Sequence, residues 1–273
     1  MEILSCENVA FKYNESTDYA ISDCTFSVKK GEKIMLCGAS GSGKSTLLRL
    51  LKRELSPRGE LSGNITLMGK DRSELSDRES AEKIGFVMQS PDSQTVCDKV
   101  SAELAFGLES FGVKSGEIQS RVGEMAAFFG IEPLYDRDIS TLSGGQKQLV
   151  ALCSVMATDP DILLLDEPTA QLDPVAAREL LGILDRLNKE MGVTIIIAEH
   201  DPEELFDSCD KILYLSNGKT EFFGTPALTA KYFVKNVLEG FLPETAKAFA
   251  RLCDDLPLNV RQGRAKLEKL GVT

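Results

Sequence analysis

The feature that most constrains the fold of this chain is a glycine-rich segment between an apolar run and a helical pattern. Residues 38–46 read Gly-Ala-Ser-Gly-Ser-Gly-Lys-Ser-Thr, which is a complete G-x-x-x-x-G-K-[ST] motif. Residues 33–37 are largely apolar and predict a buried strand, and the leucines over 47–55 recur at helical spacing. A strand, a glycine-rich loop and a helix start, in this order, place backbone N–H groups around a phosphate. The sequence therefore predicts a phosphate-binding loop rather than a glycine-rich turn with an incidental lysine.

Each part of this loop has an expected role. The glycines let the backbone adopt conformations closed to other residues, so that its N–H groups can point at phosphate oxygens. Lys44 is expected to contact the outer phosphates, and the Ser45 hydroxyl is expected to bind Mg²⁺. The residues expected to line the phosphates are Gly38, Ala39, Ser40, Gly41, Ser42, Gly43, Lys44, Ser45 and Thr46.

Composition and charge narrow the class of protein. The 273 residues are 42% apolar and 27% charged, which is ordinary for a soluble globular protein. No apolar stretch approaches the roughly 20 residues that span a bilayer, and the first residues lack the features of a signal peptide. We therefore expect a cytosolic chain that reaches a membrane only through a partner. The net charge of −11 argues against broad nucleic-acid binding. Seven cysteines without a C-x-x-C pair indicate reduced thiols rather than disulfides or a metal site.

The hydrophobic patterning predicts a mixed α/β chain. Alternating residues over 1–32 indicate antiparallel strands. The runs 161–165 and 193–198 are continuously apolar and indicate central parallel strands that are buried on both faces. The other expected elements are a strand over 60–69, a short strand over 84–88, helices over 92–158, a helix over 174–191 followed by Gly192, a hairpin over 211–224 that turns at Asn217-Gly218, and a mostly helical tail over 226–273 with breaks at Pro243 and Pro257.

Polar residues follow three of these predicted strands. Because ligands bind outside the carboxyl ends of parallel strands, Gln89, Asp166, Glu167 and His200 are expected to share one crevice with the phosphate loop. Asp166 would hold Mg²⁺ as a hard oxygen ligand, and Glu167 would orient and deprotonate the attacking water. Gln89 would touch the metal or that water, and His200 would sense the γ-phosphate. Taken singly, each has a structural alternative: a strand end, a surface glutamine, a structural histidine. Their convergence favours the site.

Residues 142–148, Leu-Ser-Gly-Gly-Gln-Lys-Gln, form a second distinctive segment. Ser143 can cap a helix that starts near Gly145. The glycines expose backbone N–H groups and so create a second anion-binding helix end. One nucleotide does not need two such ends from one chain, so a second copy or a homologue would supply this one. An ordinary capped helix is the alternative.

In combination, these motifs resemble the nucleotide-binding subunits of ATP-binding cassette (ABC) transporters. Over about residues 2–225 they stand in the order of that family: phosphate loop 38–46, Q-loop Gln89, signature 142–146, Asp166 with Glu167, D-loop 170–173 and switch histidine His200. The resemblance implies ATP and Mg²⁺ as cofactors. It implies catalytic roles for Lys44, Gln89, Glu167 and His200, metal binding by Ser45, Gln89 and Asp166, and nucleotide binding by Ser143, Gly144, Gly145, Gln146 and Asp173. Tyr13, 25 positions before Gly38, matches the tyrosine that stacks on adenine, with a plain strand tyrosine as the alternative.

A finer resemblance concerns one group within the family. Residues 89–94, Gln-Ser-Pro-Asp-Ser-Gln, and the helix over 100–107 resemble the ATPases of energy-coupling-factor (ECF) transporters and the cobalt-type CbiO group, from which Ser90 is a mild departure. Residues 241–243 and 256–261 resemble that group's C-terminal helical extension. A Q-loop of another kind of importer is the alternative.

The resemblance implies a RecA-like α/β P-loop NTPase core with an antiparallel β subdomain, and with a helical subdomain near 92–158. These form an ABC ATPase domain over 1–225, which a C-terminal helical extension follows over 226–273. The implied function is ATP hydrolysis that powers uptake of a vitamin or a transition-metal ion. The implied partners are a second ATPase chain, identical or paralogous, a transmembrane coupling protein and a separate membrane protein that captures substrate.

The implied location is peripheral, at the cytoplasmic face of the membrane. The groove near residues 89–94, with Glu103 and Phe106 of the following helix, is the expected contact to the membrane partner. The alternative for Glu103 is a position inside the helical subdomain, where it would support the fold. A soluble ABC ATPase that acts on ribosomes or nucleic acid is the main alternative, and an exporter ATPase is another. The single cassette disfavours the first, and residues 89–107 disfavour the second.

Overall fold

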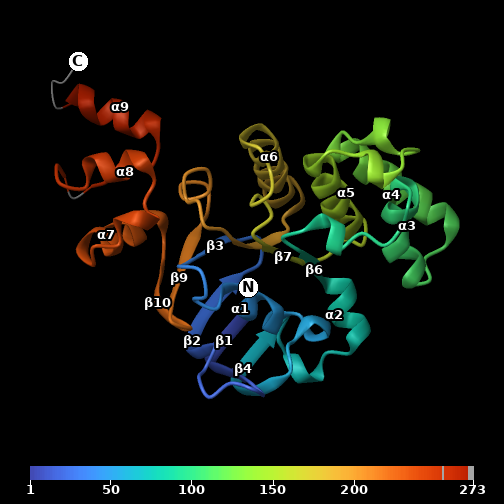
Figure 1. Ribbon diagram of the computed structural model, residues 1–273, viewed down its shortest axis with the longest axis horizontal. Helices are drawn as coiled ribbons and strands as arrows, with labels where there is room; N and C mark the ends of the chain where they lie inside the picture. The colour runs from blue at the N-terminus through green and yellow to red at the C-terminus, as the bar shows by residue number, and fades with distance from the viewer. Residues whose placement is uncertain (254, 270–273) are drawn as a thin grey trace. The chain divides into compact units, whose positions relative to one another are not determined.

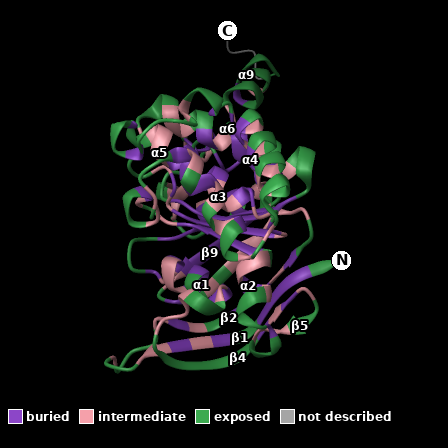
Figure 2. Cartoon of the chain, turned by 90° about the vertical axis from the view of Figure 1, so that its right-hand side faces the viewer, coloured by how far each residue is buried: buried purple, intermediate pink, exposed green. Residues whose placement is uncertain are grey.

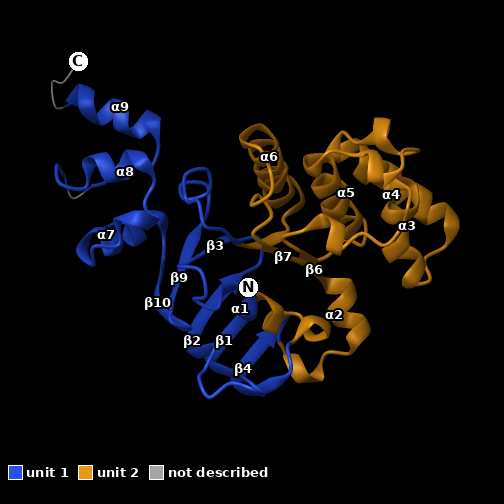
Figure 3. Cartoon of the chain, in the orientation of Figure 1, with its two compact units in different colours: residues 1–47, 57–69, 198–273 blue, residues 48–56, 70–197 orange. Residues whose placement is uncertain are grey.

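The computed structural model describes residues 1–253 and 255–269 of the chain. The chain divides into two compact units (Figure 3). Unit 1 consists of residues 1–47, 57–69 and 198–273, and unit 2 consists of residues 48–56 and 70–197. Helix α1 (Lys44–Leu51) begins in unit 1 and continues into unit 2.

Unit 1 contains an antiparallel sheet that the N-terminal sequence predicts. Its strands, in the order β2-β1-β4, are β2 (Ile21–Lys29), β1 (Glu2–Tyr13) and β4 (Gly59–Leu67) (Figure 1). Both pairings of β1 are antiparallel. Alternate residues of β2 are buried, which is the pattern of a strand with one face on a core. The prediction of antiparallel strands over 1–32 is therefore confirmed.

A second group of strands in unit 1 leads into the glycine-rich loop. The strand order is β10-β9-β3, with β3 (Lys33–Cys37), β9 (Lys211–Ser216) and β10 (Lys219–Gly224). Strand β3 runs parallel to β9 and is buried at every residue, and β10 pairs antiparallel with β9. The turn between β9 and β10 places Asn217 at φ 49° and Gly218 at φ 77°, as a two-residue hairpin turn requires. The predicted hairpin is confirmed.

The tail of unit 1 is helical, as predicted. It holds α7 (Pro226–Lys235), the 3₁₀ turn η6 (Glu239–Phe241), α8 (Glu244–Phe249) and α9 (Val260–Lys269) (Figure 1). An aromatic cluster joins this tail to β9: the Tyr214 ring lies 5.1 Å from Phe233 and 5.3 Å from Phe241 between centroids. Pro243 takes the N-cap position of α8, at one of the predicted breaks. Residues 254 and 270–273 of the predicted tail lie outside the described residues.

Three strands of unit 2 match the predicted apolar runs. They stand in the order β8-β7-β6, with β8 (Thr194–Ala198), β7 (Ile162–Asp166) and β6 (Ile84–Val87). The short β5 (Lys70–Asp71) was not predicted. All residues of β6, β7 and β8 are buried, and β6 pairs with β7 in parallel. Figure 2 shows how the buried interior strands contrast with the partly exposed helices.

Helices make up the rest of unit 2. The α-helices are α2 (Asp77–Lys83), α3 (Val100–Ser110), α4 (Ser115–Phe129), α5 (Gly144–Met156) and α6 (Pro174–Met191). The 3₁₀ turns are η1 (Arg53–Leu55), η2 (Arg72–Glu74), η3 (Pro91–Ser93), η4 (Glu132–Leu134) and η5 (Ile139–Thr141). The helix predicted over 174–191 is confirmed, and Gly192 ends it in the left-handed conformation at φ 71°.

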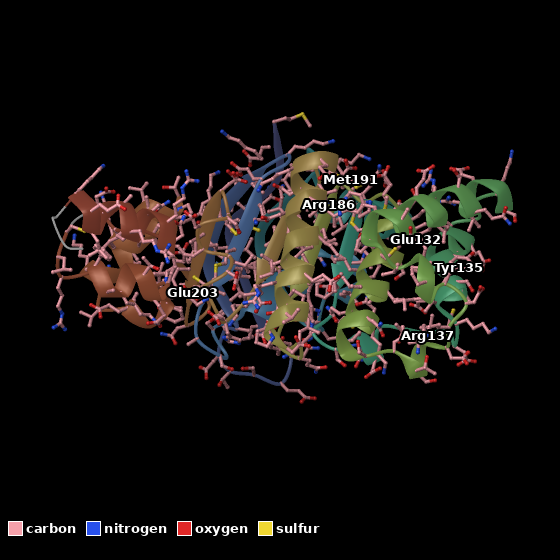
Figure 4. The ribbon with its side chains drawn as sticks, turned by 90° about the horizontal axis from the view of Figure 1, so that it is seen from above. Glu132, Tyr135, Arg137, Arg186, Met191 and Glu203 are labelled. Atoms are coloured by element: carbon pink, nitrogen blue, oxygen red, sulfur yellow. The ribbon has the colours of Figure 1, made fainter. Side chains whose placement is uncertain are left out.

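One side-chain contact joins α6 to α4. Arg186 of α6, labelled in Figure 4, donates to the Phe128 carbonyl at 3.2 Å, and its guanidinium lies 4.2 Å from the Phe128 ring centroid. The leucine pattern over 47–55 predicts one continuous helix, but α1 ends at Leu51, and Leu55 lies in η1. The helix stops because Lys52 takes an extended backbone, at φ −111° and ψ 116°.

Within the described ranges, we find no helix that combines the length and the apolar character needed to cross a bilayer.

Candidate nucleotide-binding site

The glycine-rich loop of unit 1 has a backbone that only glycine can supply at two points. Gly38 has φ 154°, and a Cβ there would lie 2.2 Å from the Leu215 carbonyl oxygen. Gly43 has φ 103°, and a Cβ there would lie 2.7 Å from the Ala20 carbonyl oxygen. A side chain at either position would collide with backbone, so the loop keeps its shape only with glycine.

Two polar side chains of the loop, those of Ser42 and Lys44, are buried. Lys44 is buried, and its Nζ donates to the carbonyl oxygens of Gly38 at 2.9 Å and of Ala39 at 3.2 Å. The Ser42 hydroxyl is buried and has no hydrogen-bond partner among residues 1–253 and 255–269. The Lys44 ammonium group and the unbonded Ser42 hydroxyl are hydrogen-bond donors, and an anion bound at the loop would accept from both. The loop therefore fits a phosphate group.

Tyr13 lies beside the loop, as the sequence predicts for an adenine contact. Its hydroxyl and the Thr46 hydroxyl lie 2.9 Å apart, and its ring meets Phe11 edge-on with centroids 5.0 Å apart. Because Thr46 belongs to the first turn of α1, this bond ties the end of β1 to the helix that the loop starts. Stacking on adenine remains a prediction.

In unit 2, two predicted catalytic side chains meet. Val87 of β6 pairs with Leu165 of β7 in a parallel register, so the residues that follow emerge at the same edge. The Gln89 amide donates to Oε2 of Glu167 at 3.1 Å. Glu167 has φ 50°, which is uncommon for a residue with a side chain, and such strained backbone clusters at functional sites. The predicted proximity of Gln89 and Glu167 is confirmed.

Asp166 is the last residue of β7 and is buried. Its carboxylate lies 4.0 Å from the guanidinium of Arg49, a residue of α1 that is half exposed. This cation is absent from the sequence-predicted set. The available signal is its position on the helix that follows the loop, five residues after Lys44. Arg49 provides positive charge beside the carboxylate predicted to bind metal.

The signature segment forms the helix start that its sequence predicts. Ser143 is the N-cap of α5, and a reciprocal capping box joins it to Gln146. Asp173 is the N-cap of α6, and its carboxylate accepts from Val175 N at 2.9 Å and Ala176 N at 3.1 Å. These backbone hydrogen bonds lower the pKa of Asp173.

The two helix starts lie side by side. A Cβ on Gly145 would lie 2.9 Å from Ala176 Cβ, so glycine permits the close approach of α5 to α6. Ser143, Gly145, Gln146 and Asp173 all line one concavity of about 490 Å³. The structure thus brings the signature and Asp173 together in unit 2, and Gly144 is exposed beside them.

His200 lies two residues after the end of β8 and is exposed. The predicted site residues therefore fall into two sets. Unit 1 holds the loop, Tyr13 and His200, and unit 2 holds the remainder, namely Gln89, Ser143, Gly144, Gly145, Gln146, Asp166, Glu167 and Asp173. The union of the two sets in one catalytic site stays a prediction.

Gln94 and Glu103 fix the Q-loop and the stretch after it through hydrogen bonds that the sequence does not predict. The side chain of Gln94 accepts from Met88 N at 2.9 Å and donates to the Phe86 carbonyl at 3.1 Å, which closes the loop on itself. Glu103 was expected either to face the groove or to point into the helical subdomain, and it does line the groove. Its side chain is buried, and its Oε2 accepts from Val96 N at 3.0 Å and Cys97 N at 2.9 Å.

The groove expected near the Q-loop does exist in unit 2. It has a volume of about 280 Å³ and is lined by residues of α2, β6, α3 and α5. Phe106 on its wall is 47% exposed and Val96 is 64% exposed, so apolar side chains stand open at this surface. Nearby, Asp92 of the Q-loop forms an ion pair of 2.6 Å with Lys147 of α5, so the Q-loop is tied to the signature helix.

A comparison with protein-family models matches residues 21–170 to the ABC transporter model. The matched residues run from β2 through the loop, Gln89 and the signature to Glu167, and they make up more than half of the chain. The chain belongs to the ABC transporter family. The predicted family, the P-loop ABC ATPase fold and the class of ATP-binding cassette are thereby confirmed.

Curated relatives of this ABC cassette differ in length. A candidate ABC transporter ATP-binding protein of Bacillus thuringiensis is 42% identical over 95% of this chain and 48% of its own length. One of Streptomyces coelicolor is 37% identical over 97% of this chain and 46% of its own length. One of Pyrococcus abyssi is 39% identical over 83% of this chain and 81% of its own. The chain thus spans about half the length of the Bacillus and Streptomyces relatives.

Solved structures of ABC cassettes share the fold. CbiO1 of Clostridium perfringens, part of the ABC transporter complex cbiONQ, has a TM-score of 0.78 and 32% identity over 97% of this chain and 98% of its own. The cassette MJ0796, solved as a dimer bound to ADP and Pi, has a TM-score of 0.70 and 27% identity over 82% of this chain and 99% of its own.

Proposed function

We propose that the chain is the ATP-binding and ATP-hydrolysing subunit of an ECF-type importer for a micronutrient, either a vitamin or a transition-metal ion. The observation that carries this proposal is the likeness to CbiO1, which extends over 97% of the chain. The MJ0796 cassette covers only 82%. The additional length in the CbiO1 match supports a shared C-terminal helical region and with it the CbiO group. The names of the curated relatives favour transport over action on ribosomes or nucleic acid.

In this proposal the loop binds the phosphates of ATP. Its backbone N–H groups and the buried Ser42 hydroxyl donate to phosphate oxygens, and Lys44 exchanges its bonds to loop carbonyls for bonds to the outer phosphates. Tyr13 packs on the adenine. Ser45 and Asp166, with Gln89, would hold Mg²⁺, which when bound neutralises charge on the phosphate oxygens.

Glu167 acts as the general base in the proposed reaction. Its carboxylate takes a proton from the attacking water, and the 3.1 Å bond from Gln89 keeps one carboxylate oxygen oriented. His200 donates a hydrogen bond to the γ-phosphate, so this contact exists only while the γ-phosphate is bound. This division assigns binding to the loop and proton transfer to the end of β7.

A second cassette completes each site in the proposed assembly. The helix starts at Ser143 and Asp173 lie together in unit 2, and two anion-binding helix ends from one chain exceed the needs of one nucleotide. The Bacillus relatives are about twice as long as the matched region, which leaves room for another cassette in one polypeptide. We propose that here an identical or paralogous chain supplies it.

A transmembrane coupling protein is the proposed occupant of the groove near the Q-loop, at the cytoplasmic face of the membrane. The apolar side chains of Phe106 and Val96 offer the contact, and the Asp92–Lys147 ion pair links that contact to the signature helix. A separate membrane protein would capture the substrate and set its identity.

Affinity capture from membranes tests this proposal. Phe106→Asp should lose the membrane partner while ATP binding and melting temperature stay close to wild type, because the ring is largely exposed. Glu109→Gln, an exposed change on the same helix, is the matched control and should retain the partner. Recovery of ribosomes or DNA by the wild-type chain, with no membrane protein, would support the soluble ATPase instead.

Light scattering tests the proposed second cassette. Glu167→Gln with ATP should dimerise with itself or with a paralogue, and adding Ser143→Arg should prevent this, because the bulky side chain would occupy the position of the partner's phosphate. A Glu167→Gln protein that stays monomeric with ATP and the paralogue present would contradict the shared site.

A further inference from the structure

The segment after His200 is a compact turn in unit 1. Leu205 N and Phe206 N both donate to the Pro202 carbonyl, at 3.2 and 2.8 Å. Asp201 accepts from Glu203 N at 3.0 Å through its side chain. Ser208 N and Cys209 N both donate to the Leu205 carbonyl, so local hydrogen bonds restrain the backbone along the segment 201–209.

One acidic residue of this segment contacts α8. Glu203 Oε2 accepts from Glu244 N at 2.7 Å. Pro243 at the N-cap position of α8 has no side-chain acceptor, so the first N–H of the helix takes its acceptor from Glu203. Figure 4 shows Glu203 next to the C-terminal helices.

A second acidic residue contacts α9 with both carboxylate oxygens. Asn259 Nδ2 donates to Asp207 Oδ2 at 2.5 Å, and Gln262 Nε2 donates to Asp207 Oδ1 at 3.4 Å. The same two amides bond to the start of α9: Asn259 Oδ1 accepts from Gln262 N, and Gln262 Oε1 accepts from Leu258 N, each at 2.8 Å. The start of α9 therefore fixes both amides, and Asp207 has a preformed pair of donors.

The residue after this segment, Asp210, is bonded to the start of strand β3. Asp210 and Lys33 exchange two bonds of 2.8 Å, one from Lys33 N to the carboxylate and one from Asp210 N to the Lys33 carbonyl. Lys33 is the first residue of β3, the strand that leads into the phosphate loop. Phe206 is fully buried, and its ring centroid lies 6.3 Å from that of Phe233 in α7. The segment is thus held between the strand of the loop and the C-terminal helices.

We propose that Glu203 and Asp207 are positioning residues through which the C-terminal helices set the placement of His200. This inference rests on the proposed function, in which His200 senses the γ-phosphate. His200 is three residues from Glu203, and the turn between them is fixed by the Asp201 side chain, so a displacement of α8 and α9 reaches the histidine. The C-terminal extension therefore tunes hydrolysis without contacting nucleotide.

NMR of the full chain tests the structural half directly. The sequence has one histidine, so an isotope-labelled imidazole gives one set of signals that reports His200 without assignment. Asp207→Ala removes the link but leaves the Asn259–Gln262 bonds of α9, and it should shift the imidazole signals. Glu268→Ala, an exposed acid farther along α9, is the control and should leave them unchanged. Signals of Asp207→Ala that coincide with wild type would overturn the inference.

Kinetics tests the functional half. Asp207→Ala and Glu203→Ala should each lower kcat about three- to tenfold while the ATP affinity changes less than about twofold, since positioning rather than binding is lost. Glu203→Gln keeps an acceptor oxygen for Glu244 N and should retain most of the rate. Asp207→Ala combined with Asn259→Asp, which keeps the acceptor for Gln262 N, should be no worse than Asp207→Ala alone if both act through one contact.

The outcomes separate the inference from the proposed function. Shifted imidazole signals with an unchanged kcat would overturn the coupling to hydrolysis. A wild-type chain that binds ATP but never hydrolyses it would refute the proposed function. The imidazole signals would still decide whether the C-terminal helices set the position of His200.

Discussion

Replacing Glu103 by leucine should destabilise unit 2, although the residue stands on a helix that borders the groove. Its side chain is only 4% exposed, and one carboxylate oxygen accepts the N–H groups of Val96 and Cys97. Leucine is similar in size but offers no acceptor. The change would leave two backbone donors without their partner and release the stretch between the Q-loop and α3.

The cost follows from these contacts. A hydrogen bond to a charged group contributes about 1.5–3 kcal/mol, so two would contribute about 3–6 kcal/mol. Both bonds are only part-buried, so water replaces some of the loss, and the apolar side chain recovers some burial. We expect a net loss of about 2–4 kcal/mol, which at about 2–4 °C per kcal/mol lowers the melting temperature by about 4–16 °C.

Thermal melting followed by circular dichroism measures this loss. Glu109→Leu is the matched control, because Glu109 is exposed on the same helix, and it should melt within about 2 °C of wild type. Glu103→Gln keeps an oxygen acceptor and should fall between the two. If Glu103→Leu melts within about 2 °C of wild type, the carboxylate does not hold residues 96–97, and the reasoning is refuted.

Two further predictions concern ionisable groups. Asp173→Ala should lower the melting temperature at neutral pH, because two N-cap hydrogen bonds are lost. Backbone hydrogen bonds lower the pKa of Asp173, so its contribution to stability is present above the ordinary aspartate pKa and is lost as the pH falls through the lowered pKa. The difference in melting temperature between Asp173→Ala and wild type should therefore vanish on acidification. A difference that persists well below that pKa in a pH series of melts would contradict it. Burial raises the pKa of Cys24 to about 11 and that of Cys37 and Cys153 to about 12. Burial and the Glu103 carboxylate also raise the pKa of Cys97, so iodoacetamide should modify the half-buried Cys253 first. Mass spectrometry that finds Cys37 modified as fast as Cys253 would be incompatible with that burial.

Much of the site was predictable because short-range rules decide it. The motif places glycines at the positions where the loop backbone takes φ angles that other residues avoid. The residues that follow two neighbouring parallel strands lie at the same edge of the sheet, so Gln89 and Glu167 meet although 78 positions separate them. The Ser143–Gln146 pair closes within one helical turn, and the sequence alone identifies it.

The rest depends on tertiary packing. The sequence left the orientation of Glu103 open between the groove and the helical subdomain. Its helical spacing within the buried stripe of Val100, Leu104 and Leu108 is the signal that favours burial. The bond between Asp207 and Asn259 spans 52 positions, and no local pattern selects that partner. Helix α1 ends four residues before Leu55, because an extended Lys52 breaks it despite the leucine spacing.

The measurement that tests the central claim most directly is phosphate release from Mg-ATP by the purified wild-type chain and by Glu167→Gln. ATP binding to both proteins is measured in parallel. The carboxylate at the end of β7 is proposed to take the proton from water, so an amide there should keep ATP affinity within about twofold and slow hydrolysis by about 10² or more. A Glu167→Gln chain that releases phosphate at the wild-type rate would contradict the account.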